Sequence, residues 1–390
     1  MIPIRYNLRN LVVRKTTTIA SGMGLALVVF VLASALMLSH GIERTLGRAA
    51  AEDVAVVLRK GSDTELSSGI SNSQVGVIVA NPGVAKAEDG QPLASGELIV
   101  VILLDKIGTD GGFSNVQVRG VGDNVLKVRK GVTIVEGRAA RPGTNEVIVG
   151  KAIRGRFKGL ELGESFDLRK NRPATVVGIF EDGGSSNESE VWADLGTAAS
   201  AFGREGFVSS VRVKLESPAK LDAFKTAVET NPQLEAVVMR ETDYAAKQSE
   251  LTSLFIKAMG IGISVLFSIG AVIGAMITMN ASIASRQREI ATLRALGFRR
   301  GSILLSFLLE SAALAFGGGL IGALASLCMS FVRFSTINFA TWSEISFTFE
   351  PTPPILATAM TVAVVMGLAG GFYPAVRAAR MNLVQAMRGG

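Results

Sequence analysis

The strongest constraint on the fold is a set of four apolar runs, each long enough to cross a lipid bilayer as a helix. A hydrocarbon core about 30 Å thick needs roughly 20 apolar residues of α-helix. Runs without Asp, Glu, Lys or Arg cover residues 16–42, 258–285, 311–332 and 351–376, and the third has an apolar lead-in from Ile303 that only Glu310 interrupts. We therefore predict four transmembrane helices, with both chain ends on one side of the membrane.

The basic residues indicate which side of the membrane faces the cytoplasm. Short loops rich in Lys and Arg stay cytoplasmic. Three segments are rich in basic residues: the two chain ends and the link between the second and third runs. Together they hold one acidic residue, Glu289. Their basic residues are Arg5, Arg9, Arg14, Lys15, Arg286, Arg288, Arg294, Arg299, Arg300, Arg377, Arg380 and Arg388. The formal net charge of +7 thus follows from membrane topology, and we expect no nucleic-acid partner.

These patterns predict an alternation of membrane and aqueous segments along the chain. We place a cytoplasmic N-terminus at 1–15, transmembrane helices at 16–42, 258–285, 303–332 and 351–376, a periplasmic domain with a helical stalk at 43–257, a cytoplasmic helix at 286–302, a periplasmic loop at 333–350 and a cytoplasmic tail at 377–390. The fold class is therefore membrane α-helical with a large extracytoplasmic domain between the first two membrane helices.

The first apolar run has a second interpretation. Basic residues, an apolar run and the small residues Ala33-Ser34-Ala35 together resemble a signal peptide with its cleavage site. Cleavage within residues 1–35 would leave the orientation of the other three runs unchanged, so charge counting does not distinguish the two interpretations. N-terminal sequencing of the mature protein would.

The segment 43–257 is predicted to be an α+β domain. Apolar, β-branched runs such as DVAVVLRKG, LIVVILLD, NVQVRGVG, EVIVG, ATVVGIF and SSVRVKL are typical of strands. Helices are expected at 73–80, 151–157 and 218–230. The flanking residues 43–53 and 243–257 contain good helix formers and no Pro. They would continue the membrane helices as a two-helix stalk, or form two frayed linkers.

Motifs for enzyme chemistry are missing from the sequence. The phosphate-binding pattern of Gly, four residues and Gly-Lys-Ser/Thr is absent, as is Gly-x-Ser-x-Gly. One His and one Cys leave no metal-ligand spacing. We therefore expect a non-catalytic protein without cofactor or metal.

Glycines and one carboxylate stand out within the apolar runs. Small residues let helix backbones approach closely in lipid, so we interpret the Gly-x-x-x-Gly spacings as helix-packing positions: Gly270 with Gly274, Gly318 with Gly322, and Gly367 with Gly371. Glu310 lies near the cytoplasmic start of the third helix. It would form an interfacial ion pair with an arginine such as Arg300, or serve as a proton relay.

The cytoplasmic link SIASRQREIATLRALGFRRGS predicts a short basic amphipathic helix that ends at Gly297. The pattern alone fits a helix lying on lipid headgroups as well as a lever that a cytoplasmic partner moves. However, RQREIATLRALGFRR, followed by ILLSFLLESAALAFGGGLIGA and GFYPAVRAARMNLVQAMR, resembles the permease module of the MacB/FtsX superfamily of bacterial ABC transporters. More weakly, residues 16–240 resemble the MacB-like periplasmic core.

This resemblance implies a mechanotransmission permease subunit of the bacterial inner membrane, of the split type without a fused ATPase. Its partners would be separate cytoplasmic ABC ATPase subunits, a second permease copy or a paralogue, membrane lipid and a periplasmic adaptor of the membrane-fusion type. The 286–302 helix would be the coupling helix, with contacts expected from Arg288, Glu289, Leu293, Arg294, Leu296 and Gly297.

The implied function is transmission of ATP-driven motion to the external domain, for export or for release of a lipoprotein. Two alternatives stay open at this point. An FtsX-like regulator would use the external domain to activate a periplasmic cell-wall hydrolase. A receptor or scaffold would need no ATPase at all.

Overall fold

The structure of the protein is a computed structural model that describes residues 15–108, 111–339 and 341–381. The predicted N-terminal segment, apart from Lys15, and the end of the predicted tail, including Arg388, lie outside these residues. The chain divides into two compact units. Unit 1 contains Met1–His40, Phe255–Val332 and Phe349–Gly390, and unit 2 contains Gly41–Leu254 and Arg333–Thr348.

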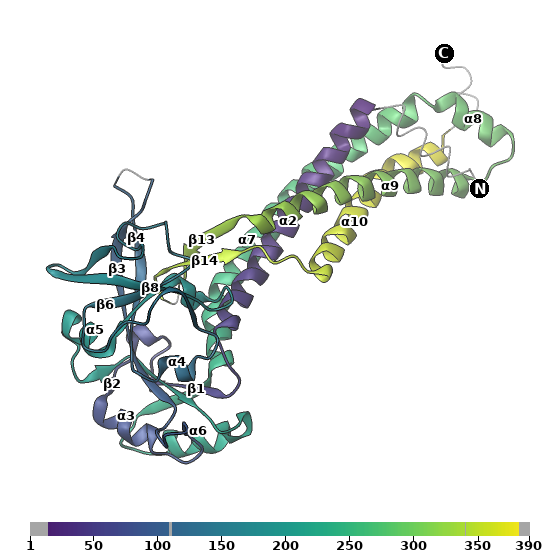
Figure 1. Cartoon of the computed structure of the whole chain (residues 1–390). Coiled ribbons are helices and arrows are strands. Elements are labelled where there is room, and N and C mark those ends of the chain that lie inside the picture. The colour runs from purple at the N-terminus through teal and green to yellow at the C-terminus, as the bar shows by residue number, and fades with distance from the viewer. Residues whose placement is uncertain (1–14, 109–110, 340, 382–390) are drawn as a thin grey trace. The chain divides into compact units, whose positions relative to one another are not determined.

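Unit 1 is built from helices (Figure 1). Among the residues that the structure describes, four helices are long and apolar enough to cross a membrane. Each covers one predicted apolar run, and the first two extend beyond theirs into polar sequence. The four long helices are α2 Lys15–Arg48, α7 Glu241–Ala284, α9 Arg300–Leu327, which the 3-10 turn η4 Cys328–Phe331 follows, and α10 Pro353–Ala379. A short helix, α8 Gln287–Ala295, lies between α7 and α9 in the chain.

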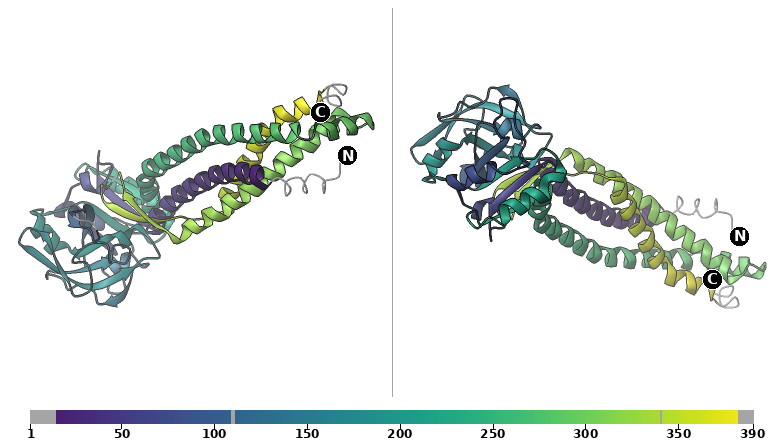
Figure 2. Two further views of the ribbon diagram at one scale, coloured as in Figure 1. Left: turned by 90° about the horizontal axis from the view of Figure 1, so that it is seen from above. Right: turned by 90° about the horizontal axis from the view of Figure 1, so that it is seen from below.

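Small side chains bring the four long helices into contact, and Figure 2 shows them running alongside one another. Ser21 of α2 donates a hydrogen bond to Thr278 of α7 over 2.8 Å. A Cβ added at Gly370 of α10 would lie 2.9 Å from the Cβ of Ala275 in α7. Because interior positions are held by Ala, Gly and Ser, the backbones approach closely, as expected in lipid.

Unit 2 is a large α+β domain around a mixed ten-stranded sheet with the order β12-β1-β11-β3-β4-β9-β6-β8-β5, to which β7 pairs at β8 (Figure 1). The strands are β1 Val54–Arg59, β3 Ala94–Asp105, β4 Phe113–Val121, β5 Thr133–Gly137, β6 Glu146–Gly150, β7 Ser165–Arg169, β8 Arg172–Glu181, β9 Glu190–Asp194, β11 Ser210–Lys214 and β12 Ala236–Arg240. Two short strands, β2 Ile70–Ser71 and β10 Phe207–Val208, pair separately.

Helices and turns cover this sheet over two apolar cores. Their bounds are η1 Glu65–Ser67, α3 Asn72–Val79, α4 Val125–Val128, η2 Ser186–Ser189, α5 Leu195–Phe202, η3 Pro218–Lys220 and α6 Leu221–Glu229. One core gathers residues of β1, β11 and β12 with α3 and α6, and includes the fully buried Phe224. The other gathers residues of β3, β4, β6, β8 and β9 with α5, and includes the fully buried Phe157.

One local expectation was wrong, and one segment contains more regular structure than was expected. The segment 151–157, predicted as a helix, forms consecutive turns, because Gly155 has a left-handed φ of 71° and Phe157 pairs in an isolated bridge with Lys106. The segment 333–350, predicted as a loop, contains an antiparallel hairpin of β13 Arg333–Ile337 and β14 Glu344–Thr348. We call this the β13–β14 hairpin; it belongs to unit 2.

Candidate functional site

The predicted coupling segment contains α8, which a buried ion pair joins to α9. Arg286, directly before α8, donates from Nη1 to Oε2 of Glu310 over 3.0 Å, and both side chains are less than a tenth exposed. The Arg286 guanidinium also lies 5.4 Å from the centroid of the Phe307 ring. Arg286 also donates from Nε to Oε2 of Glu289 over 3.3 Å. Breaking a buried ion pair is strongly destabilising, so the pair with Glu310 fixes the position of this turn against α9.

The expected ion pair between Glu310 and an arginine of the basic link is present, but the arginine is Arg286 and not Arg300. Arg300 is exposed at the first residue of α9. Glu310 follows it by ten positions, and ten residues of α-helix separate the two along the axis by about 15 Å. Arg286 lies in the turn between α7 and α8, where the chain returns toward the middle of α9. Both arginines belong to the same basic link, and the tertiary packing decides between them.

A second contact joins α8 to the end of α10. Arg294 donates from Nη1 to the carbonyl oxygens of Ala379, at 3.3 Å, and Met381, at 3.1 Å. The last carbonyls of a helix lack partners within the helix and carry its negative partial charge, so a guanidinium is a suitable cap. Ile290, 4% exposed, packs into an apolar cluster with residues of α7, α9 and α10. The helix α8 is thus attached to its neighbours on one side.

The other predicted contact residues differ in exposure. Arg288 and Glu289 are exposed and Leu293 is half-buried. Leu296 is the C-cap of α8 and is 73% exposed. Gly297 closes the helix with a φ of 91°. Leu296 therefore offers a contact surface, whereas Arg294 positions α8 within the chain.

The predicted packing glycines have different surroundings. Side chains added at Gly318 and Gly322 would meet the backbone of α2 at Gly22 and Ala26. In α10, Gly367 faces Ala315 and Gly371 faces Ser311, both in α9. Gly270 and Gly274 of α7 have no described heavy atom within 4 Å of an added Cβ. The same spacing thus brings helices together in α9 and α10, and leaves an open face on α7.

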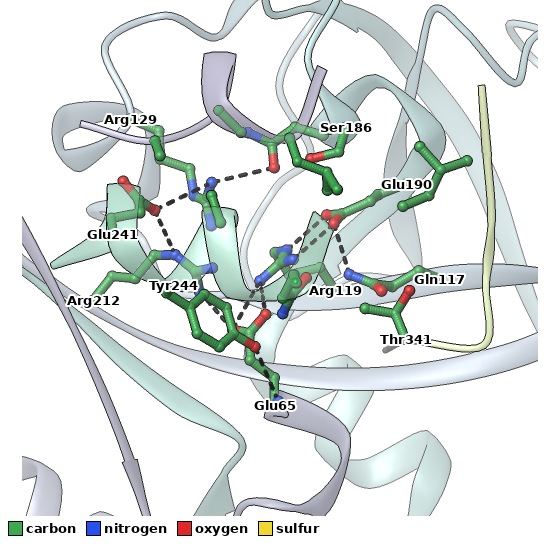
Figure 3. A pocket seen from close by; sticks show the side chains of 17 residues that line it. Glu65, Gln117, Arg119, Arg129, Ser186, Glu190, Arg212, Glu241, Tyr244 and Thr341 are labelled. Carbon is green, nitrogen blue, oxygen red and sulfur yellow. Dashed lines mark hydrogen bonds and ion pairs between the residues drawn. The ribbon is translucent and has the colours of Figure 1, made fainter. Parts of the chain in front are cut away.

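The most unusual feature of unit 2 is a buried cluster of charged side chains, which Figure 3 shows from close by. We call it the ionic cluster. It consists of the carboxylates Glu65, Glu97, Glu190 and Glu241 and the guanidiniums Arg119, Arg129 and Arg212, all less than a tenth exposed. Every member except Glu97 lines a cavity of about 50 Å³, and these six members are labelled in Figure 3.

Glu97 of β3 lies at the centre of the ionic cluster. Its Oε2 accepts hydrogen bonds from Arg119 at 2.6 Å, Arg212 at 2.7 Å and Arg129 at 3.1 Å. Burial alone would raise the pKa of the Glu97 carboxyl, but Arg129, Arg212 and Arg119 outweigh it and hold the pKa at about 2. Glu97 is therefore a carboxylate throughout the neutral and mildly acidic range.

The ionic cluster joins the sheet to the start of α7. Arg212 of β11 donates to Glu65 at 2.6 Å and to Glu241, the first residue of α7, at 2.9 Å. Glu241 also accepts from the backbone N–H of Ala51, just after α2, at 3.0 Å. On the other side, Arg119 of β4 pairs with Glu190 of β9 at 2.6 Å. Four neighbouring strands and the ends of two long helices thus meet at one set of charges.

Sequence reasoning did not find the ionic cluster, although a signal was present. Within the strand run NVQVRGVG, Gln117 and Arg119 alternate with Val, so both project from one face of β4. A buried strand with a charged residue at an inward position requires a partner. The sequence does not reveal which distant residues supply it.

The β13–β14 hairpin packs beside the ionic cluster. Glu344, 3% exposed, pairs with Lys106 at 2.8 Å and with Arg156. Asn115 of β4 donates to the carbonyl oxygen of Trp342 at 2.7 Å. Thr341 and Ile345 of the hairpin segment line the 50 Å³ cavity. The segment between α9 and α10 therefore forms part of the wall around the buried charges.

Comparison with known proteins agrees with this architecture. Residues 17–231 match the family described as MacB-like periplasmic core domain, and residues 261–383 match the FtsX-like permease C-terminal family. The macrolide export ATP-binding/permease protein MacB of Chromobacterium violaceum is 32% identical over 222 residues, which is 55% of this chain and 33% of that protein. The MacB of Hahella chejuensis is 28% identical over 296 residues, 70% of this chain and 43% of that protein.

The chain thus spans less than half the length of these two relatives. Among solved structures, the periplasmic region of MacB from Actinobacillus actinomycetemcomitans shares 12% identity at a TM-score of 0.38, covering 50% of this chain and 92% of that chain. The assignment rests on the two family matches, of which the first alone covers more than half of the sequence. The chain belongs to the family of MacB/FtsX-like ABC transporter permeases.

Proposed function

We propose that this chain is the permease subunit of an ABC transporter of the bacterial inner membrane and that it transmits ATP-driven motion from cytoplasmic ATPase subunits to its α+β domain in the periplasm. The work done there would be export or release of a lipoprotein. The two MacB relatives are named as export ATP-binding/permease proteins. ATP hydrolysis would take place in separate partner subunits, and a second permease copy or paralogue would complete the assembly.

The observation that carries this proposal is the attachment of α8. Its Arg286–Glu310 pair and its Arg294 cap hold it to α9 and α10, while Leu296 is 73% exposed. An element that is fixed to two membrane helices and exposes an apolar side chain is suited to receive a push and pass it on. Motion can be transmitted only if the partner contacts α8 differently in its two states.

Two further features support transmission across the membrane. The helix α7 is continuous from Glu241 to Ala284, and its first residue belongs to the ionic cluster. The β13–β14 hairpin follows α9 and precedes α10 in the chain and is anchored in unit 2. A displacement of these helices would therefore reach the sheet through buried ion pairs, which resist separation.

The test is the coupling between the chain and an ATPase. The full chain is purified in mild detergent, and the ATPase that co-purifies is assayed with and without it. We expect Leu296→Asp to lower the stimulation of ATP hydrolysis at least tenfold, because a desolvated apolar contact would receive a charge. Leu162→Asp is the matched control, since Leu162 is also exposed, at 43%, but belongs to unit 2.

Unchanged stimulation with Leu296→Asp would refute the role of α8. Recovery of a cell-wall hydrolase in place of an ATPase would favour the regulator instead, and recovery of neither would favour a receptor or scaffold. The proposed orientation, with both termini cytoplasmic, is tested by labelling single cysteines in a Cys328→Ser background, because Cys328 is the only cysteine.

A further inference from the structure

Unit 2 contains a second cavity, separate from the ionic cluster. Its volume is about 170 Å³, and it lies where β4 and β9 end, beside α4, β6 and the segment 139–142. The large apolar side chains in its wall are Val121, Val125, Leu126, Pro142, Ile148 and Trp192. A cavity of roughly 150 Å³ lined by apolar side chains is large enough to bind benzene. The space is therefore sufficient for one small ring or one branched aliphatic group.

The cavity exists because small residues stand where larger ones would fill it. Gly122, Ala139, Ala140 and Ala193 all line it. These positions contribute no more than a Cβ, so the walls of large side chains do not meet across the space. The space is open to solvent, because Leu126, Ala139 and Pro142 of its lining are exposed, so a ligand can enter it without unfolding.

The wall formed by Trp192 is rigid. This side chain is 1% exposed, and its Nε1 donates to Oε2 of Glu190 at 2.7 Å. The ring centroid of Phe180 lies 4.6 Å from that of Trp192. The guanidinium of Arg129 lies 5.6 Å from the Trp192 ring centroid. Because the indole is held by these contacts, the cavity is preformed and would lose little entropy when a ligand enters.

The charged residues of the lining are all acidic. Asp123 and Asp194 line the cavity, and no Lys, Arg or His of the described part of the chain does. One oxygen of Asp194 caps α5 by accepting from the backbone N–H of Thr197 at 2.9 Å. Asp123 is exposed beside the apolar wall. The polar part of a ligand held here would therefore meet negative charge.

The nearest basic residues in sequence are directed elsewhere. Arg138 pairs with Glu146 and Lys127 pairs with Asp89. The pKa of the Glu146 carboxyl is lowered mainly by hydrogen bonds from the Arg138 side chain and the Arg141 backbone. The charge of Arg141 lowers this pKa further. Among the residues that the structure describes, no ion pair joins Asp123 or Asp194 to a basic side chain, so both carboxylates can attract a cationic ligand.

We propose that this cavity binds the apolar group of an amphiphilic amine, with the ammonium beside Asp123 and Asp194. The ligand class is a small ring or branched aliphatic group joined by a short chain to a cationic nitrogen. Apolar burial supplies the affinity, and the two carboxylates select the cation over neutral analogues. The inference does not depend on the proposed transport function and holds for the domain itself.

Trp192 provides the readout. The chain has two tryptophans, and the other, Trp342, is 62% exposed. In the full-length Trp342→Phe variant, held in lipid nanodiscs, Trp192 alone reports occupancy of the cavity. We expect 2-phenylethylamine to change its fluorescence saturably. Neutral 2-phenylethanol, which has the same ring and chain length, should bind about fivefold more weakly, the size of effect expected from exposed charges.

Two variants test whether the amine binds in the cavity or in the lipid bilayer. Ala140→Leu would fill the cavity and abolish the saturable change. Asp123→Asn keeps the shape, should leave binding of 2-phenylethanol unchanged and should weaken 2-phenylethylamine about threefold. The proposal is overturned if Ala140→Leu binds the amine as the parent does, if the alcohol binds as tightly as the amine, or if no saturable change occurs. None of these outcomes bears on ATPase coupling.

Discussion

The ionic cluster makes a quantitative prediction about stability. Arg212 pairs with three carboxylates, Glu65 at 2.6 Å, Glu97 at 2.7 Å and Glu241 at 2.9 Å. In Arg212→Met the methionine fills most of the space, but all three carboxylates lose a donor. The cluster already holds one more carboxylate than guanidinium, and the excess would rise to two. Breaking a buried pair by removing one partner costs about 3 to 5 kcal/mol.

This cost translates into a measurable melting temperature. For a domain of this size, each kcal/mol lowers Tm by about 2 to 4 °C, so we expect a drop of roughly 6 to 20 °C. Fluorescence of Trp192, whose indole donates to Glu190 of the ionic cluster, follows unfolding in the Trp342→Phe background. The measurement is made on the full chain in nanodiscs, with parent and variant compared in the same lipid.

Arg138→Met is the matched control. Arg138 also pairs with a glutamate, Glu146, but its side chain is 44% exposed. An exposed pair contributes about 1 kcal/mol at most, so the control should lose no more than a few degrees. If Arg212→Met lowers Tm no further than Arg138→Met does, the buried charges do not hold unit 2 together, and the reasoning from their geometry fails.

Three more outcomes are expected. Because the pKa of Glu97 falls from 4.5 to about 2 on folding, its stabilisation of about 3 kcal/mol is complete above pH 4.5 and is lost as the pH falls through 2. The Tm gap between the parent and Glu97→Gln should therefore narrow in that window, and a constant gap would contradict the pKa. Gly322→Ala should lower Tm, because the added Cβ would clash with the backbone of α2 at a cost of about 1 to 3 kcal/mol. Gly270→Ala places its Cβ in open space and should leave Tm unchanged. Equal effects of the two variants would argue against close packing of α9 on α2. Arg286→Met breaks the buried pair with Glu310 and should lower the stability by about 3 kcal/mol, while Arg300→Met should be nearly neutral. A larger loss of Tm in Arg300→Met than in Arg286→Met would indicate that Arg300 is the partner of Glu310.

The sequence predicts the parts of the fold that depend on local composition. Long uncharged runs specify four helices without reference to anything distant. The helical continuation into polar sequence, for which frayed linkers were the alternative, is present in α2 through Arg48 and in α7 from Glu241. Failures arise where a backbone conformation decides, as at Gly155, whose positive φ interrupts a run of otherwise adequate helix formers.

The candidate sites were less predictable because they depend on partners far apart in the chain. Gly270–Gly274 and Gly318–Gly322 have identical spacing, yet only the second pair meets another helix. Arg286 and Arg300 lie in one basic link, and packing selects the first. The ionic cluster draws residues from seven separated positions. Alternation along a strand identifies the inward charges, but it contains no information about which distant charges neutralise them.

The β13–β14 hairpin has a practical consequence for anyone wishing to study the α+β domain in water. A fragment cut at residues 41 and 254 would omit Thr341 and Ile345, which line the cavity at the buried charges, and Glu344, which pairs with Lys106. Solvent would then enter where the hairpin normally excludes it. A soluble fragment should instead include residues 333–348, joined to residues 41–254 by a flexible linker. Comparing the amide hydrogen exchange of the two fragments would show how much protection those sixteen residues provide.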